Sequence, residues 1–263
     1  MRAIFIADAH LKYMHDDNYR MLLQFLNEQR GALDALFILG DLFEFWIGHR
    51  SMPFPQYQPI LNELLRLQSE GVAIHYFEGN HDFHLGPFFT ETIQARVYRS
   101  AALLELDGKK VYACHGDQIN TRDVGYRLLR FALHNRLTGI VARFVPPSIT
   151  VKLADRMARN SKKKYRRRAS KWNYHAILRA FAERRFTDGC DTFITGHFHI
   201  PLQEQTGPQG KQTIVSLGDW IHRYSYAEWE DGAVRLKIYQ PASNEHPQRC
   251  RTGTDTARHA PEG

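Results

Sequence analysis

Side chains that could bind metal ions follow several short apolar runs of this sequence. One stretch, "GNHDFHLG" at residues 79–86, places an asparagine, a histidine and an aspartate in a row behind such a run. A tight turn explains Gly79 and Asn80, but it does not explain why His81 and Asp82 follow at once. The same pattern recurs at five runs, and the side chains collected in this way are Asp8, His10, Asp41, Asn80, His81, Asp82, His115, His197 and His199.

These residue types suit divalent-metal chemistry. Imidazole and carboxylate groups bind Mn, Fe, Zn or Co, and no thiolate accompanies them. Asp8-x-His10 and His197-x-His199 each place two donors on one side of an extended segment, because side chains alternate there. A single residue of this kind is more often a turn, capping or structural residue. Five groups at one edge are hard to explain by turn chemistry alone, so the pattern predicts a metal site.

Such a site could hold two ions. An aspartate at the centre of the set, such as Asp41, can bridge two metals ~3.5–4 Å apart, which clamp a phosphoryl group and activate a hydroxide. Asn80 would then offer its carbonyl oxygen to one metal, and Gly79 would allow close approach of the backbone. His81 is left to face the substrate, with Asp82 able to orient its ring.

Buried strands would bring these side chains together. The apolar runs are 3–7, 35–39, 72–77, 110–114, 192–195 and 213–217. Runs this short, and rich in Val, Ile and Phe, are typical of strands buried on both faces. Residues 19–30 and 59–71 have the apolar spacing of helices, and Gly71 is expected as a C-cap. Strands alternating with helices indicate a layered α/β sheet, in which ligands collect outside the carboxyl ends of the strands.

Three segments stand apart from this alternation. No strand is expected from residue 118 to about 186, which predicts a helical insertion. It has amphipathic helices at 126–136 and 137–145, followed by a run of Lys and Arg between 152 and 171. Asp231-Gly232 between alternating runs predicts a hairpin. The polar tail 241–263 is expected to be disordered, which leaves residues 1–240 as a single domain.

The composition limits the possible partners and compartments. The chain has 263 residues, 43% of them hydrophobic, and a formal net charge of +7, so an anionic partner such as nucleic acid, phosphate or acidic lipid is favoured. Its three cysteines form no CxxC pair, which argues against a disulfide framework and favours a reducing cytoplasm. No signal peptide and no membrane-spanning helix are expected.

The motifs D-x-H, G-D, G-N-H-D, H-G-D and G-H-x-H occur in this order between Asp8 and His199. They resemble those of the calcineurin-like metallophosphoesterases. The resemblance implies a layered α/β sandwich, in which central mixed β-sheets are flanked by helices, with a helical lid insertion. It implies two divalent metal ions, with Mn²⁺ as the expected metal. One ion would lie on Asp8, His10, Asp41 and His199, and the other on Asp41, Asn80, His115 and His197. His81 would stabilise the pentacoordinate phosphorus or protonate the leaving oxygen.

A narrower resemblance concerns the stretches "GDLFEFWIG", "GNHDFHLG", "HGDQINTRDVGY", "RMARNS" and "GDW". They are similar to the UDP-2,3-diacylglucosamine pyrophosphatases of lipid A synthesis, which release UMP and a diacyl-sugar phosphate at the cytoplasmic face of the inner membrane. The resemblance implies substrate contacts at Asn80, His81, Asp123, Tyr126, Arg159, Ser161, Tyr165, Arg168 and His197. That family usually has arginine, asparagine and lysine where this chain has His81, Tyr165 and Arg168.

Apolar helices beside a basic cluster fit an acylated UDP-sugar substrate. They also fit a cytoplasmic protein in peripheral contact with the anionic inner membrane. Neither nucleic acid nor an obligate protein partner is expected. Two alternatives stay open: a phosphodiesterase or phosphatase of the same fold that acts on nucleotides, and a non-catalytic scaffold. The apolar insertion argues against the first, and the complete set of candidate ligands argues against the second.

Overall fold

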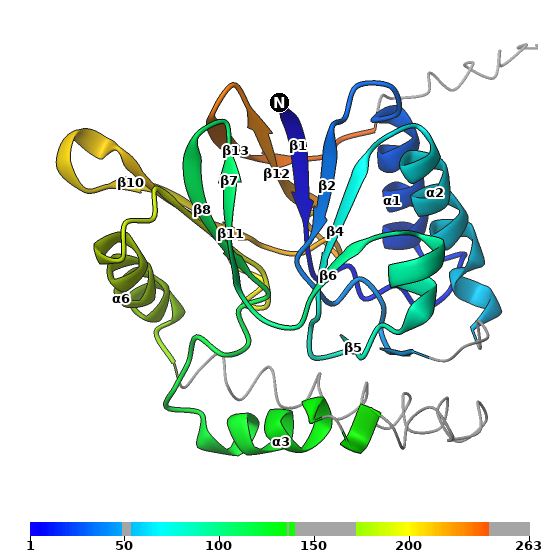
Figure 1. The fold of residues 1–263 in the computed structure, drawn as a ribbon, viewed down its shortest axis with the longest axis horizontal. Coiled ribbons are helices and arrows are strands. Elements are labelled where there is room, and N and C mark those ends of the chain that lie inside the picture. The colour runs from blue at the N-terminus through cyan, green and yellow to red at the C-terminus, as the bar shows by residue number, and fades with distance from the viewer. Residues whose placement is uncertain (49–53, 136, 140–171, 242–263) are drawn as a thin grey trace, which may run out of the picture.

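Two mixed β-sheets lie at the centre of the molecule (Figure 1). The structure is a computed structural model that describes residues 1–48, 54–135, 137–139 and 172–241. The first sheet contains β1 (Arg2–Ile6), β2 (Ala35–Ile38), β4 (Ala73–Phe77), β6 (Arg96–Tyr98), β12 (Ser225–Glu230) and β13 (Ala233–Ile238). The second contains β7 (Ala102–Leu106), β8 (Lys109–Cys114), β9 (Thr192–Thr195), β10 (Pro201–Thr206) and β11 (Gln212–Leu217). The strand orders are β13-β12-β1-β2-β4-β6 and β10-β11-β9-β8-β7, and β3 (Trp46–Ile47) pairs separately with β5 (Asp82–Phe83).

Helices cover the outer faces of both sheets, which gives four layers. In the described part of the chain α1 (Asp17–Glu28) and α2 (Gln58–Ser69) cover the first sheet and α6 (Tyr174–Thr187) covers the second, whereas α3 (Val124–His134) lies outside these layers; η1 (Pro55–Tyr57), η2 (Phe88–Thr92) and η3 (Pro208–Gly210) are short turns. Alternate side chains of β1 serve two cores: Ile4 and Ile6 pack with α1 and α2, whereas Phe5 lies between the sheets. A third core lies between α6 and the second sheet. The expected layered α/β sandwich is therefore confirmed.

The six apolar runs expected to be strands are β1, β2, β4, β8, β9 and β11 in the structure. The two helices expected at 19–30 and 59–71 are α1 and α2, and Gly71 follows α2 at φ 91°. The expected hairpin joins β12 to β13. Its turn residues Asp231 and Gly232 have φ of 50° and 72°, as a type I′ turn requires.

The sequence analysis missed β3, β5, β6, β7 and β10. β10 alternates between exposed and partly buried residues, so it contains no apolar run. β7 lies at the edge of its sheet with Leu103 59% exposed. β3 and β5 have two residues each and β6 has three, which is too few for a periodic pattern to be seen.

The range 118–186, expected to be a helical insertion, contains α3 and α6 and no strand in its described part. α6 packs through Leu178, Ala182 and Phe186 into the third core, so it forms the outer layer of the second sheet. The expected helix at 137–145, beyond residue 139, and the basic run lie outside the described residues, as does the tail beyond 241. No helix in the described part of the chain is long and apolar enough to cross a membrane.

The carboxyl ends of the central strands meet at one edge of the sandwich. β1, β2 and β4 run parallel in the first sheet, and β8, β9 and β11 run parallel in the second. In Figure 1 these ends point to the lower edge, and α3 lies beneath it. The fold therefore brings the loops that follow β1, β2, β4, β8 and β9 together from both sheets.

The core between the sheets gives a first prediction. Phe37 is 1% exposed and stacks on Phe5 and on His75, with ring centroids 4.4 and 4.3 Å away. Phe37→Ala should lower the free energy of unfolding by ~3–5 kcal/mol through lost burial and a residual cavity. Urea unfolding followed by circular dichroism measures this. The exposed control Leu103→Ala should change it by less than about 0.5 kcal/mol, and equal effects of the two substitutions would contradict the assigned core.

Candidate metal centre

The strand-end loops place the predicted metal donors in neighbouring groups. Asp8 and His10 follow β1, Asp41 follows β2, Asn80 follows β4, and the remaining three donors follow β8 and β9. Within each group the ligand atoms lie within 4.8 Å of one another, and the groups are Asp8-His10-His199, Asp41-His115-His197 and His10-Glu44-His81. The edge predicted from the sequence therefore carries the predicted donors from both sheets.

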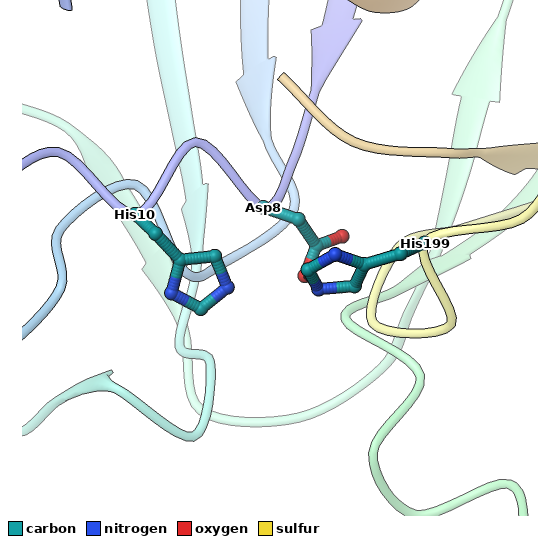
Figure 2. A group of neighbouring side chains, drawn as sticks. All are labelled: Asp8, His10 and His199. Carbon is teal, nitrogen blue, oxygen red and sulfur yellow. The ribbon is translucent and has the colours of Figure 1, made fainter. Parts of the chain in front are cut away.

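The first group joins the two sheets. Figure 2 shows the carboxylate of Asp8 and the ring of His10, both from the loop after β1, beside the ring of His199 from the loop after β9. Nε2 of His199 lies 3.4 Å from Oδ1 of Asp8. The other oxygen of Asp8 accepts a hydrogen bond of 2.7 Å from the backbone N–H of His197. Asp8 is fully buried, so its charge depends on the groups around it.

The second group surrounds His115. Nε2 of His115 lies 3.6 Å from Oδ2 of Asp41, 3.2 Å from Oδ1 of Asn80 and 3.2 Å from Nδ1 of His197. The same oxygen of Asp41 lies 3.6 Å from Nε2 of His10. Asp41 Oδ2 therefore faces donors of both groups, which is the position of a bridging carboxylate.

Two features of these groups fit divalent cations. Oδ1 of Asp8 is buried and makes no hydrogen bond, although burying an unpaired polar atom is costly. Three candidate ligand atoms also crowd around Nε2 of His115, while its Nδ1 is held at 2.7 Å from the carbonyl oxygen of Leu39. Burial would lower the pKa of His115, but Asp41 and Asp8 raise it; once the ring is neutral, the hydrogen bond to Leu39 leaves the lone pair on Nε2, as metal ligation requires.

The backbone at these donors adopts an unfavourable conformation. Asp8, His10, Asp41, His197 and His199 all have positive φ, between 46° and 69°. Left-handed φ at a residue other than glycine costs about 1–3 kcal/mol and is concentrated at functional sites. Five such residues in one cluster indicate that the fold holds the donor geometry against local preference.

Glycines let the donors approach one another. A Cβ at Gly79 would lie 2.2 Å from Oδ1 of Asp41, and one at Gly196 would lie 2.7 Å from Oδ2 of Asp8. Any side chain at these two positions would push a donor away. The close approach predicted for Gly79 is confirmed.

Asp82 has a different task from the one expected. Its carboxylate accepts hydrogen bonds from the backbone N–H groups of Asp41, Leu42 and Gly79, and from the hydroxyl of Tyr76. It therefore fixes the loops that carry Asp41 and Asn80. The ring of His81 is oriented instead by the carbonyl oxygen of Glu44, which lies 2.8 Å from its Nδ1.

The residues expected to contact substrate are only partly described. Asp123 caps α3 by accepting the N–H of Tyr126. The hydroxyl of Tyr126 donates to Asp117 at 2.8 Å, and its ring lies 5.9 Å from that of His197. Arg159, Ser161, Tyr165 and Arg168 lie outside the described residues.

Asp117 and Glu44 were not singled out from the sequence. Asp117 also accepts a hydrogen bond of 2.5 Å from Nε of Arg130, so it ties α3 to the loop of His115. Asp117 belongs to the H-G-D motif and Glu44 lies three residues after Asp41. Their motifs drew attention, but the partner of each side chain depends on tertiary structure.

The charges within the cluster shift the pKa values of its groups. Burial alone would raise the pKa of Asp41, but the neighbouring His115, His81 and His10 hold it well below its usual range. Burial would lower the pKa of His10, yet Glu44, Asp41 and Asp8 together raise it to about 9. Burial and the neighbouring His115 lower the pKa of His197 to about 4. Without metal, His10 is therefore a charged imidazolium near neutral pH, whereas His197 is a neutral imidazole.

Residues 1–201 match the family model described as calcineurin-like phosphoesterase. The match covers more than half of the chain, and the chain belongs to this family. Membership makes it a metal-dependent hydrolase and implies a site for two divalent metal ions, for which the two donor groups around Asp41 are the candidates.

Proteins named UDP-2,3-diacylglucosamine hydrolase are similar to nearly the whole chain. The protein of Photorhabdus laumondii is 32% identical over 241 residues, which cover 90% of this chain and 98% of the relative. That of Pseudomonas putida is 32% identical, covering 84% and 91%. That of Stutzerimonas stutzeri is 34% identical, covering 82% and 90%.

Metal binding should release protons near neutral pH. A cation on Nε2 of His10 must displace a proton that is bound below pH 9, so affinity should rise up to about tenfold per pH unit as pH increases from 6 to 8.5. His197 should contribute no proton in this range. Titration calorimetry with Mn²⁺, in buffers of different ionisation enthalpy, measures both quantities. An affinity that stays flat, with no proton released at pH 7.5, would contradict this protonation state.

Proposed function

We propose that this protein hydrolyses the pyrophosphate bond of UDP-2,3-diacylglucosamine to UMP and 2,3-diacylglucosamine 1-phosphate, a step of lipid A biosynthesis. It would use two Mn²⁺ ions and act in the cytoplasm, in peripheral contact with the inner membrane. The relatives named above support the substrate, since they match this chain over nearly their whole length. The local structure supplies an independent argument.

The observation that carries the proposal is an apolar helix beside the donor cluster. α3 lies beneath the strand-end edge (Figure 1), and the contact between Tyr126 and Asp117 joins it to the loop of His115. Yet Val124, Leu128 and Phe131 are 68%, 69% and 75% exposed. Apolar side chains of this size normally avoid water unless they meet a ligand, a partner or a membrane. These three side chains lie on the side of α3 opposite Tyr126, which faces the loop of His115. A polar metal centre on one side of the helix and an apolar face on the other fit a substrate with a phosphorylated head and acyl chains.

The roles of individual residues follow from the geometry. Two bound divalent cations would polarise the scissile phosphorus centre and supply a hydroxide nucleophile near neutral pH. Asp8, His10, Asp41 and His199 would hold one cation, and Asp41, Asn80, His115 and His197 the other. His81 donates Nδ1–H to the carbonyl oxygen of Glu44, so its Nε2 is the nitrogen available to the substrate.

His81 would stabilise charge in this reaction as an imidazolium, with a second proton on Nε2. Burial lowers the pKa of its ring, so this role requires the anionic phosphoryl group to raise that pKa on binding. A phosphate ester leaves as a weak base, so protonation of the leaving oxygen is less important than stabilising the charge on the phosphoryl oxygens. Arginine or histidine can therefore serve at this position. Asp123 and Tyr126, at the start of α3, are proposed to contact the substrate, as are Arg159, Ser161, Tyr165 and Arg168.

Replacing the exposed apolar residues of α3 should separate two activities. Leu128→Ser with Phe131→Ser should lower kcat/KM for UDP-2,3-diacylglucosamine about a hundredfold or more, because burying each such side chain contributes ~1.5–3 kcal/mol. Hydrolysis of bis-p-nitrophenyl phosphate, which has no acyl chain, should change little. Release of UMP and of nitrophenol, measured with Mn²⁺, reports the two activities.

The matched control is Leu103→Ser, an exposed leucine on β7, which should leave both activities unchanged. Parallel loss of both activities in the α3 variant would mean that these side chains support the fold. No loss of either would remove the acyl-binding role of α3. If the unaltered protein hydrolyses the deacylated UDP-sugar as fast as the diacylated one, the nucleotide phosphodiesterase alternative would be favoured.

A further inference from the structure

Glu44 lies beside His10, a candidate metal ligand, and His81, the histidine expected to face the substrate. The sequence motifs assign no role to it. It stands between Phe43 and Phe45, which are 0% and 2% exposed. Its own side chain is only 15% exposed. A carboxylate this well buried between two core residues requires polar partners.

One partner is the ring of His10. Oε2 of Glu44 lies 3.5 Å from Nδ1 of His10, while the opposite nitrogen, Nε2, faces Asp41 at 3.6 Å. Nδ1 is buried and makes no hydrogen bond. Once Nε2 ligates a cation, Nδ1 must carry the ring proton. Glu44 is the acceptor placed to receive it.

The other partner is the ring of His81. The backbone oxygen of Glu44 lies 2.8 Å from Nδ1 of His81. The rings of His10 and His81 meet edge to face, with centroids 4.7 Å apart and planes at 89°. One residue therefore contacts a candidate ligand through its carboxylate and the substrate-facing histidine through its backbone.

We propose that Glu44 is a positioning residue of the metal centre: its carboxylate accepts the Nδ1–H of His10 and so directs Nε2 of His10 towards the cation shared with Asp8 and His199. Histidine ligands usually donate their second N–H to an acceptor of this kind, and loss of the acceptor typically costs 10–100-fold in metal affinity. The inference rests on the proposed ligand set, and it concerns only one of the two cations.

Metal titration of Glu44 variants tests it without any substrate. In Glu44→Ala the affinity for one of two Mn²⁺ equivalents should fall about 10–100-fold, and the affinity for the other should stay within about twofold. Glu44→Gln keeps an acceptor oxygen and should lose less than Glu44→Ala. The bond to His81 uses the backbone, so neither substitution removes it. Titration calorimetry and the paramagnetic resonance of Mn²⁺, whose paired signal should become a single-ion signal, measure these effects.

Glu63→Gln is the matched control, because Glu63 is a buried carboxylate on α2, 5% exposed, that contacts Arg66. It should leave both affinities unchanged. The ¹H–¹⁵N spectrum of the histidine rings supplies a second readout. With the diamagnetic ion Zn²⁺ bound in place of Mn²⁺, Nδ1–H of His10 should be protected from solvent exchange in the unaltered protein and exchange faster in Glu44→Ala. If Glu44→Ala does not fold, the metal affinities of Glu44→Gln and the exchange of Nδ1–H of His10 in its spectrum test the inference.

Three results would overturn the inference. The first is that both affinities for Mn²⁺ are unchanged in Glu44→Ala, and the second is that both fall equally. The third is that only the unaltered protein binds a third equivalent of Mn²⁺, which would make Glu44 a ligand. If the unaltered protein fails to bind two equivalents, the proposed metal centre itself is wrong.

Discussion

The burial of Asp8 between the two sheets is the constraint on which the site depends. Asp8 follows β1 of the first sheet, and its carboxylate accepts a hydrogen bond from the N–H of His197, which follows β9 of the second sheet. A buried carboxylate must be matched by donors or cations. The two sheets can therefore approach at this edge only with polar partners around Asp8, which here are the N–H of His197 and the ring of His199. The position of the candidate metal centre is a consequence of how the sandwich closes.

The local cost of this arrangement is considerable. Five candidate ligands have left-handed backbone, and Asp8 and His10 each retain a buried polar atom without a hydrogen bond. Compensation comes from groups outside the ligand set. Asp82 fixes the loops of Asp41 and Asn80 through backbone N–H groups, and Leu39 and Glu44 orient His115 and His81 through carbonyl oxygens. The dinuclear cation pair implied by the family would stabilise Oδ1 of Asp8, whereas Nδ1 of His10 faces the carboxylate of Glu44.

The sequence predicted the buried strands and the donors at their ends because both follow local rules. An apolar run such as that of β9 is hydrophobic on both faces, and a histidine or aspartate directly after it can be read without tertiary knowledge. β10 was missed because one of its faces is exposed. The tasks of Asp82 and Glu44 could not be predicted, since each depends on which backbone groups of another loop lie opposite. α6 was expected in an insertion, and only its packing against the second sheet places it in the outer layer.

The central claim is that Asp41 lies between two cations held by donors of both sheets. Anomalous X-ray scattering from crystals grown with Mn²⁺ tests it most directly. The account predicts two peaks ~3.5–4 Å apart, with the carboxylate of Asp41 in contact with both, His10 and His199 beside one, and His115 and His197 beside the other. A single peak, or two peaks that do not share Asp41, would contradict it.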